Sequence, residues 1–272
     1  MKLSEAVELL RRGGVENPLY DARAIFSLVG KIPMSELVLG GEVADDSAAA
    51  LAVMRRAERE PLEYVVGRVD FYRESYKIRE GVLIPRDDTE TLVDFAVGEI
   101  PRGELFLDLC TGSGCIALSV LNNTEDTRAI AVDISDSAVA LARENAEALG
   151  LCPRIEIIRE NALGSALTER CFAVLSNPPY VTEAEYEELS EEIKHEPKEA
   201  FVGGANGLDF YRAITENYKS VIDSRGFIAF EIGYAQAADI IKIADQNGMS
   251  AEIKKDLSGN DRVAVLRKRE AL

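Results

Sequence analysis

Residues 105–118 read LFLDLCTGSGCIAL, and they carry the strongest single indication of how the chain folds. The stretch begins with an apolar run, Leu105–Leu109, which is typical of a buried strand, and continues into a turn that contains Gly112 and Gly114. A helical pattern follows and extends to about Asn122. A strand, a glycine-rich turn and a helix in this order predict a βα unit whose turn approaches a ligand.

The same alternation continues to the end of the chain. We predict strands at Ala129–Ile134, Ile155–Ile158, Ala173–Ser176 and Phe227–Ile232, helices at Ser137–Leu149 and Ala235–Asn247, and a closing antiparallel pair at Glu252–Leu257 and Arg262–Leu266. Apolar strands that alternate with helices imply a mostly parallel sheet covered on both faces. Residues 86–272 therefore form an α/β domain in this prediction.

The first part of the chain has a different pattern. Residues 1–62 show helical spacing, with one apolar face made by Leu3, Ala6, Val7 and Leu10, and we expect a small helical domain there. Residues 63–85 change to the period of strands and predict a β-hairpin linker.

Composition excludes several classes of protein. The net charge is −17, and residues 1–85 carry 12 basic and 14 acidic residues, so the excess of acid lies in the rest of the chain. Such a chain suits a basic protein partner better than nucleic acid phosphates. Four cysteines without a CxxC pair and a single histidine, His195, predict neither a metal site nor a disulfide framework. Without an apolar stretch long enough to span a membrane, we expect a reducing, cytoplasmic compartment.

Polar residues at predicted strand ends indicate a cofactor. Asp133 ends the strand after the glycine turn, at the spacing typical of a carboxylate that accepts hydrogen bonds from ribose hydroxyls. This pattern predicts a nucleoside-type cofactor, and the glycine spacing leaves NAD possible. Asn161, after the next strand, is equally well interpreted as an adenine contact or as a loop asparagine.

The fourth predicted strand ends in Asn177-Pro178-Pro179-Tyr180. Prolines lack N–H donors, so this cluster offers carbonyl acceptors, an amide oxygen and an aromatic ring, but few acid–base groups. Such a site suits a substrate –NH₂ group that is oriented for attack on a sulfonium methyl group. The alternative interpretation is a stiff turn that ends the strand.

With these motifs in place, the chain resembles the class I S-adenosylmethionine-dependent methyltransferases with a Rossmann-like fold, and within them the release-factor glutamine methyltransferases. The resemblance spans nearly the whole chain and includes an N-terminal helical domain. It implies methyl transfer from S-adenosylmethionine to the side-chain N5 of the glutamine in the Gly-Gly-Gln loop of peptide chain release factors.

The resemblance also implies roles for individual residues. Those toward the cofactor are Cys110, Thr111, Gly112, Ser113 and Gly114 at the methionine end, Asp133 at the ribose, Asn161 and Ala162 at the adenine, and Asn177. Those toward the substrate glutamine are Asn177, Pro178, Pro179 and Tyr180, with Asn177, Pro178 and Tyr180 as the catalytic set and no metal. The chain departs from the family pattern at Cys110, where glycine is common, at Asp87, where proline is usual, and at Asn161-Ala162. We expect a monomer that holds no stable nucleic acid.

Two acidic stretches have more than one interpretation. Asp87 and Glu90 have the spacing of a capping box, whereas the resemblance places them near the substrate entrance. Residues 183–199 contain eight glutamates, which are typical of a solvated helical face but which we expect to steer a basic substrate loop.

Other functions stay open on the residues alone. An N6-adenine methyltransferase acting on nucleic acid would use Asn177-Pro178-Pro179-Tyr180 equally well, with Tyr180 stacked on a flipped base. An NAD-dependent oxidoreductase would use the glycine turn and Asp133, and a scaffold would keep the fold without its activity.

Overall fold

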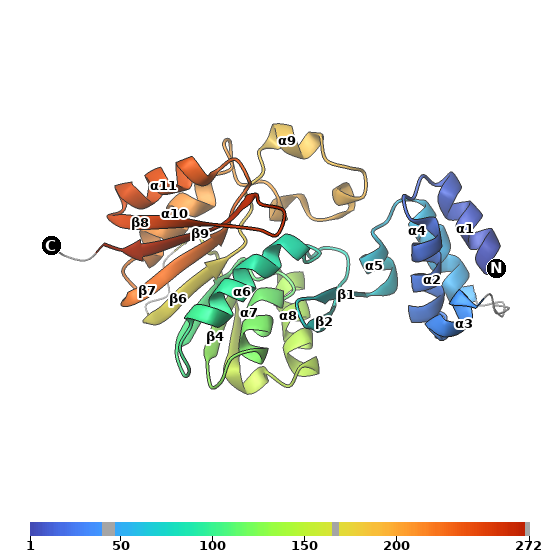
Figure 1. Ribbon diagram of the computed structural model, residues 1–272, viewed down its shortest axis with the longest axis horizontal. Helices are drawn as coiled ribbons and strands as arrows, with labels where there is room; N and C mark the ends of the chain where they lie inside the picture. Colours follow the sequence, from blue (N-terminus) through green and yellow to red (C-terminus); the bar gives the residue numbers. More distant parts are fainter. Residues whose placement is uncertain (40–46, 165–168, 270–272) are drawn as a thin grey trace. The chain divides into compact units, whose positions relative to one another are not determined.

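The computed structural model describes residues 1–39, 47–164 and 169–269. The chain forms two compact units (Figure 1). The first contains Met1–Arg68, Ile78–Glu80 and Leu189–Glu196, and the second contains Val69–Lys77, Gly81–Glu188 and Pro197–Leu272. Among the described helices, none is both long and apolar enough to cross a membrane.

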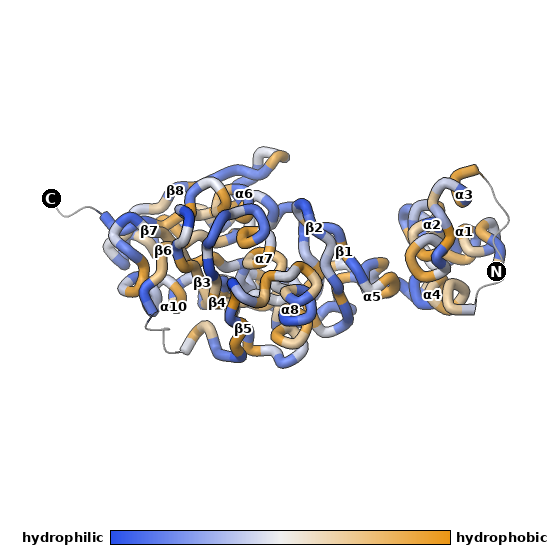
Figure 2. Tube along the Cα trace, turned by 90° about the horizontal axis from the view of Figure 1, so that it is seen from below, coloured by the Kyte–Doolittle hydropathy of each residue, from blue (hydrophilic) through white to orange (hydrophobic). Residues whose placement is uncertain are grey.

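The first unit is helical, as predicted. Its helices are α1 (Leu3–Arg12), α2 (Pro18–Leu28), α3 (Met34–Val38), α4 (Ser47–Ala57) and α5 (Leu62–Val66), and the 3-10 turn η3 (Ile193–His195) also belongs to it. Ala6 and Leu10 of the predicted apolar face are fully buried and pack in a core with Ile25 and Phe26. In Figure 2, hydrophobic and hydrophilic segments alternate along α2, as expected for a helix that buries one face.

Strands β1 (Arg68–Phe71) and β2 (Glu74–Lys77) form the predicted hairpin. The strand pattern expected from residue 63 is wrong at its start, because residues 63–66 belong to helix α5. The 3-10 turn η1 (Asp87–Thr89) and helix α6 (Glu90–Glu99) follow. Of the two interpretations of Asp87 and Glu90, the capping box is wrong, because Glu90 Oε1 accepts a 2.6 Å hydrogen bond from the backbone N–H of Tyr72 instead of turning back to Asp87. The 3-10 turn separates the two acids, so Glu90 connects α6 to the hairpin.

A seven-stranded sheet forms the centre of the second unit, in the order β5-β4-β3-β6-β7-β9-β8. Its strands are β3 (Leu105–Leu109), β4 (Arg128–Asp133), β5 (Ile155–Arg159), β6 (Cys171–Ser176), β7 (Ile222–Glu231), β8 (Met249–Lys255) and β9 (Asp261–Lys268). The pairs from β5 to β7 are parallel, and β9 pairs antiparallel with β7 and β8. This confirms the predicted mostly parallel sheet and its closing antiparallel pair.

Helices cover both faces of this sheet (Figure 1). On one face, α6, α7 (Cys115–Asn122) and α8 (Asp136–Ala148) bury their apolar sides against the strands, and on the other face α10 (Asp209–Tyr218) and α11 (Ala237–Gln246) do so. Three short elements, α9 (Glu183–Glu187), η2 (Cys152–Arg154) and η4 (Lys198–Ala200), lie in the connections.

The order of the strands locates a ligand site. The chain proceeds from β3 outward to β4 and β5 and then returns to β6 on the other side of β3. The crevice at such a reversal, outside the carboxyl ends of the strands, is where open α/β sheets bind ligands. Leu109 and Ser176, the last residues of β3 and β6, are paired at this point.

Candidate active site

A cavity of about 390 Å³ lies at the carboxyl ends of the parallel strands. Nine of the predicted site residues line it: Cys110, Thr111, Gly112, Ser113, Asp133, Asn161, Ala162, Asn177 and Pro179. Gly114, Pro178 and Tyr180 are not among its lining residues. The structure thus brings together residues that follow four different strands.

The turn after β3 has a backbone that few side chains tolerate. Gly112 and Gly114 have φ of +57° and +83°, in the left-handed region that favours glycine. A Cβ on Gly114 would lie 3.1 Å from Leu118 Cδ1 and 3.2 Å from Ala142 Cβ, so this glycine lets α8 pack closely on α7. Gly114 therefore shapes the turn from behind, whereas Gly112 lines the cavity.

Cys110 also lies in the left-handed region, with φ of +60°. A residue other than glycine is uncommon in this conformation. Burial raises the pKa of the Cys110 thiol, so the thiol stays protonated and neutral.

Asp133 is held by the backbone on both of its oxygens. Oδ2 accepts from the N–H of Gly112 at 2.9 Å, and Oδ1 accepts from the N–H of Ser135 at 2.9 Å. Burial raises the pKa of this carboxyl, and the backbone hydrogen bonds oppose that rise. Each carboxylate oxygen keeps a further lone pair, so the oriented group can accept from a diol in the cavity.

The structure uses the Asn161 side chain in a turn. Asn161 is exposed, and its Oδ1 accepts from the N–H of Leu163 at 3.0 Å. Ala162 is buried at the cavity wall. One lone pair of the Asn161 oxygen is therefore engaged locally, and the second lone pair and Nδ2 remain for an adenine contact.

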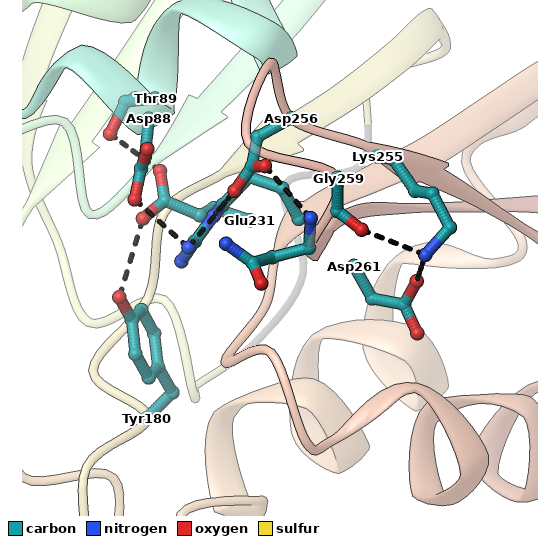
Figure 3. Close-up of polar contacts among 10 residues, drawn as sticks. Asp88, Thr89, Tyr180, Glu231, Lys255, Asp256, Gly259 and Asp261 are labelled. Carbon is teal, nitrogen blue, oxygen red and sulfur yellow. Dashed lines mark hydrogen bonds and ion pairs between the residues drawn. The ribbon is translucent and has the colours of Figure 1, made fainter.

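Asn177 is linked to a threonine that the sequence pattern did not single out. Its Nδ2 donates to Thr89 Oγ1 at 3.2 Å, and Thr89 Oγ1 donates to Glu231 Oε2 at 2.5 Å. Tyr180 reaches the same carboxylate, because its hydroxyl donates to Glu231 Oε1 at 3.3 Å. Figure 3 shows Thr89 and Tyr180 on either side of the Glu231 carboxylate.

The carbonyl groups of this motif are not all available. Gln236 Nε2 donates to the Tyr180 carbonyl at 3.1 Å, and a Cβ on Gly203 would lie 2.2 Å from the Pro179 carbonyl oxygen. The expectation that the cluster offers free carbonyl acceptors is therefore wrong at Pro179 and Tyr180. Neighbouring loops, which the sequence pattern did not place, cover these two groups.

Glu231, the last residue of β7, is 2% exposed. Burial raises its pKa to about 7, while the Thr89 hydrogen bond and the charge of Arg262 oppose the rise. Arg262 itself contacts Asp88 Oδ2 at 2.9 Å and Asp256 Oδ2 at 3.2 Å. The only sequence signal for Glu231 is an acid that ends an apolar strand.

Other lining residues come from segments outside the predicted site. They are Gly81, Val82, Leu83, Pro85, Arg86 and Thr89 before α6, Cys115 and Ile116 on α7, Ile134, Ser135 and Ala138 after β4, Leu163, and Pro197, Glu199, Ala200, Val202 and Phe210 before and at the start of α10. Most of these residues are apolar, and only Ile134 stands at a predicted strand end. The expectation that ligands bind at the carboxyl ends of the strands therefore does not identify the others.

The described residues offer little acid–base or metal chemistry elsewhere. They contain no group of three or more His, Cys, Asp or Glu side chains arranged to hold a metal ion. All four cysteines are free. His195 is exposed and lies in the first unit, whereas every cavity-lining residue lies in the second.

Comparison with known proteins adds to this geometry. Residues 89–205 match the methyltransferase small domain family, and residues 2–67 match the PrmC N-terminal domain family. The chain is 36% identical over 275 residues to the release factor glutamine methyltransferase of Fusobacterium nucleatum, covering 97% of this chain and 77% of that protein. It is 38% identical over 262 residues to the release factor glutamine methyltransferase of Thermodesulfovibrio yellowstonii, covering 93% of each chain.

A solved structure supports the fold. The ribosomal protein L11 methylase of Lactobacillus delbrueckii subsp. bulgaricus superposes with a TM-score of 0.52 at 18% identity, covering 71% of this chain and 84% of that protein. At this identity the likeness concerns the fold alone.

Proposed function

The chain belongs to the release factor glutamine methyltransferase family, and on this basis we propose that it methylates the side-chain N5 of the glutamine in the Gly-Gly-Gln loop of peptide chain release factors. The family resemblance predicted from the sequence is confirmed by relatives that are 36% and 38% identical over more than nine tenths of the chain. The enzyme is an S-adenosylmethionine-dependent methyltransferase.

The cavity fits S-adenosylmethionine, which supplies an electrophilic methyl group on a sulfonium. The volume of about 390 Å³ is that of a small-molecule site. Gly112 presents backbone without a side chain, and Asp133 is fixed by two backbone N–H groups with lone pairs to spare. We assign Cys110–Gly114 to the methionine end, Asp133 to the ribose, and Asn161 and Ala162 to the adenine.

The orientation of the Asn177 amide is the observation that carries the proposal. Because Nδ2 donates to Thr89, the opposite side of the amide presents Oδ1 as an acceptor at the cavity wall. An acceptor there binds an N–H of the substrate glutamine, orients the nitrogen and raises its electron density. Catalysis then rests on positioning and electrostatics, and it needs no histidine or metal.

Pro178, Pro179 and Tyr180 complete the substrate clamp in this proposal. The Pro178 carbonyl is the acceptor that we assign to the second N–H of the glutamine, since the carbonyls of Pro179 and Tyr180 are covered. Tyr180 is half-buried with its hydroxyl bonded to Glu231, and we assign its ring, not its hydroxyl, to the substrate.

We assign docking of the release factor to the N-terminal helical domain, residues 1–62. That unit exposes large apolar side chains, which favours contact with a protein: Leu19, Tyr20, Leu28, Met34, Val38, Leu39, Leu51 and Met54. The net charge of −17 favours a basic protein surface over nucleic acid. We further propose that the enzyme acts as a monomer in the cytoplasm.

The proposal is tested by incubating the protein with methyl-labelled S-adenosylmethionine and three substrates: a release factor, its Gly-Gly-Gln variant with Gln→Ala, and DNA. We expect label on the intact release factor alone, at the glutamine side chain by mass spectrometry. Equal labelling of the Gln→Ala variant would reject the assigned glutamine. Labelling of DNA alone would replace the proposal by adenine methylation.

A further inference from the structure

The asparagine and the tyrosine of the 177–180 motif meet on one carboxylate outside the cavity. Asn177 reaches Glu231 through Thr89, and Tyr180 reaches it directly. Each oxygen of Glu231 therefore accepts from one hydroxyl, Oε2 from Thr89 and Oε1 from Tyr180 (Figure 3). Thr89 and Asn177 line the cavity, but Glu231 does not.

Thr89 determines which way the Asn177 amide faces. A threonine hydroxyl has one hydrogen, and Thr89 gives it to Glu231, so its oxygen can only accept from Asn177. The Asn177 group that faces Thr89 must then be the NH₂ group, and Oδ1 points away from it. The direction of the Asn177 amide thus depends on whether Glu231, at the other end of this series of hydrogen bonds, accepts or donates a hydrogen bond.

The surroundings of Glu231 combine burial with few charges. The groups that act on its carboxyl are Thr89 and Asp88 from η1, Arg262 from β9, and Tyr180. The charge of Glu231 in turn helps to raise the pKa of Tyr211 on α10 and of the Cys115 thiol on α7. Tyr211 donates to the backbone carbonyl of Glu231 at 3.0 Å, so it leaves the side chain to Thr89 and Tyr180.

We propose that Glu231 is a positioning residue that, as a carboxylate, makes Asn177 present its oxygen and not its NH₂ group to the substrate amide. The reaction in which this matters rests on the function proposed above. Glu231 touches neither the cavity nor the reacting atoms, and it acts through Thr89. The same carboxylate fixes the Tyr180 hydroxyl and therefore the plane of its ring.

Protonation of Glu231 reverses the chain of hydrogen bonds. A protonated carboxyl can donate to Thr89, whose own hydrogen is then free to donate to Asn177. Asn177 would turn its oxygen to Thr89 and its NH₂ group to the cavity, where it would meet the N–H groups of the substrate. Because the pKa of Glu231 is raised to about 7, this reversal takes place as the pH falls through about 7.

The test follows the side-chain amide of Asn177 by ¹⁵N NMR with selectively labelled asparagine, in the full chain without substrate. Its signals are assigned by their loss in Asn177→Ala. In the wild type we expect them to titrate with a midpoint near 7. We expect no such titration in Glu231→Gln or in Thr89→Val. The threonine variant removes the connection between Asn177 and Glu231 but keeps the hydrogen bond from Tyr180 to Glu231. Thr89→Ser keeps the hydroxyl and should restore the titration.

Control variants separate the other groups that titrate nearby. His195→Gln removes the only histidine of the chain, and Asp108→Asn removes the other carboxyl near the site whose pKa is about 7. The titration should persist in both. Glu74→Gln removes a buried carboxylate that accepts hydrogen bonds from Ser119, Asn122 and Asn123 outside the cavity lining. This variant controls for a general loss of stability.

Kinetics with a release factor give the second readout. We expect Glu231→Gln and Thr89→Val to lower kcat by about 10-fold or more, with the Kd for S-adenosylmethionine changed less than about threefold. The fall of kcat below pH 7 should disappear in both variants and stay in Glu74→Gln. The inference is overturned if the Asn177 signals do not change with pH in the wild type, or if they titrate in Glu231→Gln as they do in the wild type. A wild type that titrates as expected but methylates no release factor overturns the proposed function instead.

Discussion

The backbone N–H of Gly112 donates a 2.9 Å hydrogen bond to Oδ2 of Asp133, and this bond joins the turn after β3 to the turn after β4. The second oxygen of Asp133 is held by the N–H of Ser135 at the start of α8. One carboxylate therefore fixes the shape of the glycine turn and is fixed by it. A ligand that enters the cavity meets an acceptor whose direction is already set, so little entropy is lost in ordering it.

Replacing Asp133 should weaken cofactor binding. Asp133→Ala removes the acceptor for the ribose and frees the N–H of Gly112, and each hydrogen bond to a charged group is worth about 1.5–3 kcal/mol. We expect the Kd for S-adenosylmethionine to rise about 10- to 100-fold in calorimetric titrations. Asp136→Asn is the matched control, because Asp136 is exposed and pairs with Arg159 outside the cavity lining. An unchanged Kd in Asp133→Ala would remove the ribose assignment.

Replacing Asn177 should affect turnover more than cofactor binding. Asn177→Ala deletes the oxygen that we assign to the substrate amide, and loss of one such oriented group costs about 10²- to 10³-fold in kcat. Single-turnover methylation of a release factor, with the Kd for S-adenosylmethionine measured in parallel, separates the two effects. Asn122→Ala, at the exposed end of α7 outside the cavity lining, controls for loss of an asparagine and should keep full activity. Equal losses in kcat and cofactor affinity would argue against the substrate role.

The sequence predicts the parts of the fold that depend on local pattern. Apolar runs predict the ends of β3, β4 and β6 to within two residues, because these strands are buried on both faces and form continuous hydrophobic segments. The start of β7 is missed, since Asp223, Ser224 and Arg225 interrupt its apolar pattern. Helix α10 is also missed, although its buried residues Tyr211, Ile214, Thr215 and Tyr218 recur at helical spacing.

The residues of the candidate site likewise fall into those that a local sequence pattern predicts and those that it does not. Residues at or just after the carboxyl ends of predicted strands, such as Cys110, Asp133 and Asn177, are found by the rule for strand ends and line one cavity. The bond between Thr89 and Glu231 joins residues 142 positions apart, and no local pattern marks such a pair. Asn161 could be found by its position, but the turn that engages its oxygen depends on the backbone conformation after β5.

Asp108 should make the stability of the protein depend on pH. Among the described residues its Oδ1 is buried without a hydrogen-bond partner, while Oδ2 accepts from Thr111 and Ala117. Burial raises its pKa from 3.8 to about 7, so the folded chain binds this proton more tightly than the unfolded chain does. The stabilisation is therefore fully present below pH about 4 and is lost as the pH rises through about 7.

Asp108→Asn removes this ionisation. The drop in Tm between pH 5 and pH 8 should shrink by roughly 5 °C, measured by scanning calorimetry. Glu216→Gln, which changes an exposed carboxylate of α10, should leave the drop as it is. If the Tm of Asp108→Asn falls between pH 5 and pH 8 by as much as the Tm of the wild type, the buried carboxyl is not the source of the pH dependence.

The acidic stretch 183–199 should speed association with a basic release factor, and the structure narrows down which glutamates can do so. Glu185 closes a helix cap with Thr182, Glu192 pairs with Arg56 and Arg59, and Glu183 and Glu187 lie within ion-pair distance of Lys198. Within the described part of the chain, Glu188 and Glu199 are exposed and have no ion pair, and Glu199 also lines the cavity. These two are the residues to reverse without disturbing the fold.

The double variant Glu188→Lys/Glu199→Lys should lower the association rate severalfold at low salt and flatten its dependence on ionic strength. The matched control is Glu147→Lys/Glu216→Lys, since these exposed residues stand near the ends of α8 and α10 that are remote from cavity-lining Ala138 and Phe210. The control makes the same change in net charge, so it separates local steering from the overall charge of the protein. Stopped-flow binding at several salt concentrations measures both. If the two double variants lose rate and salt dependence equally, net charge attracts the partner and the acidic stretch does not steer it.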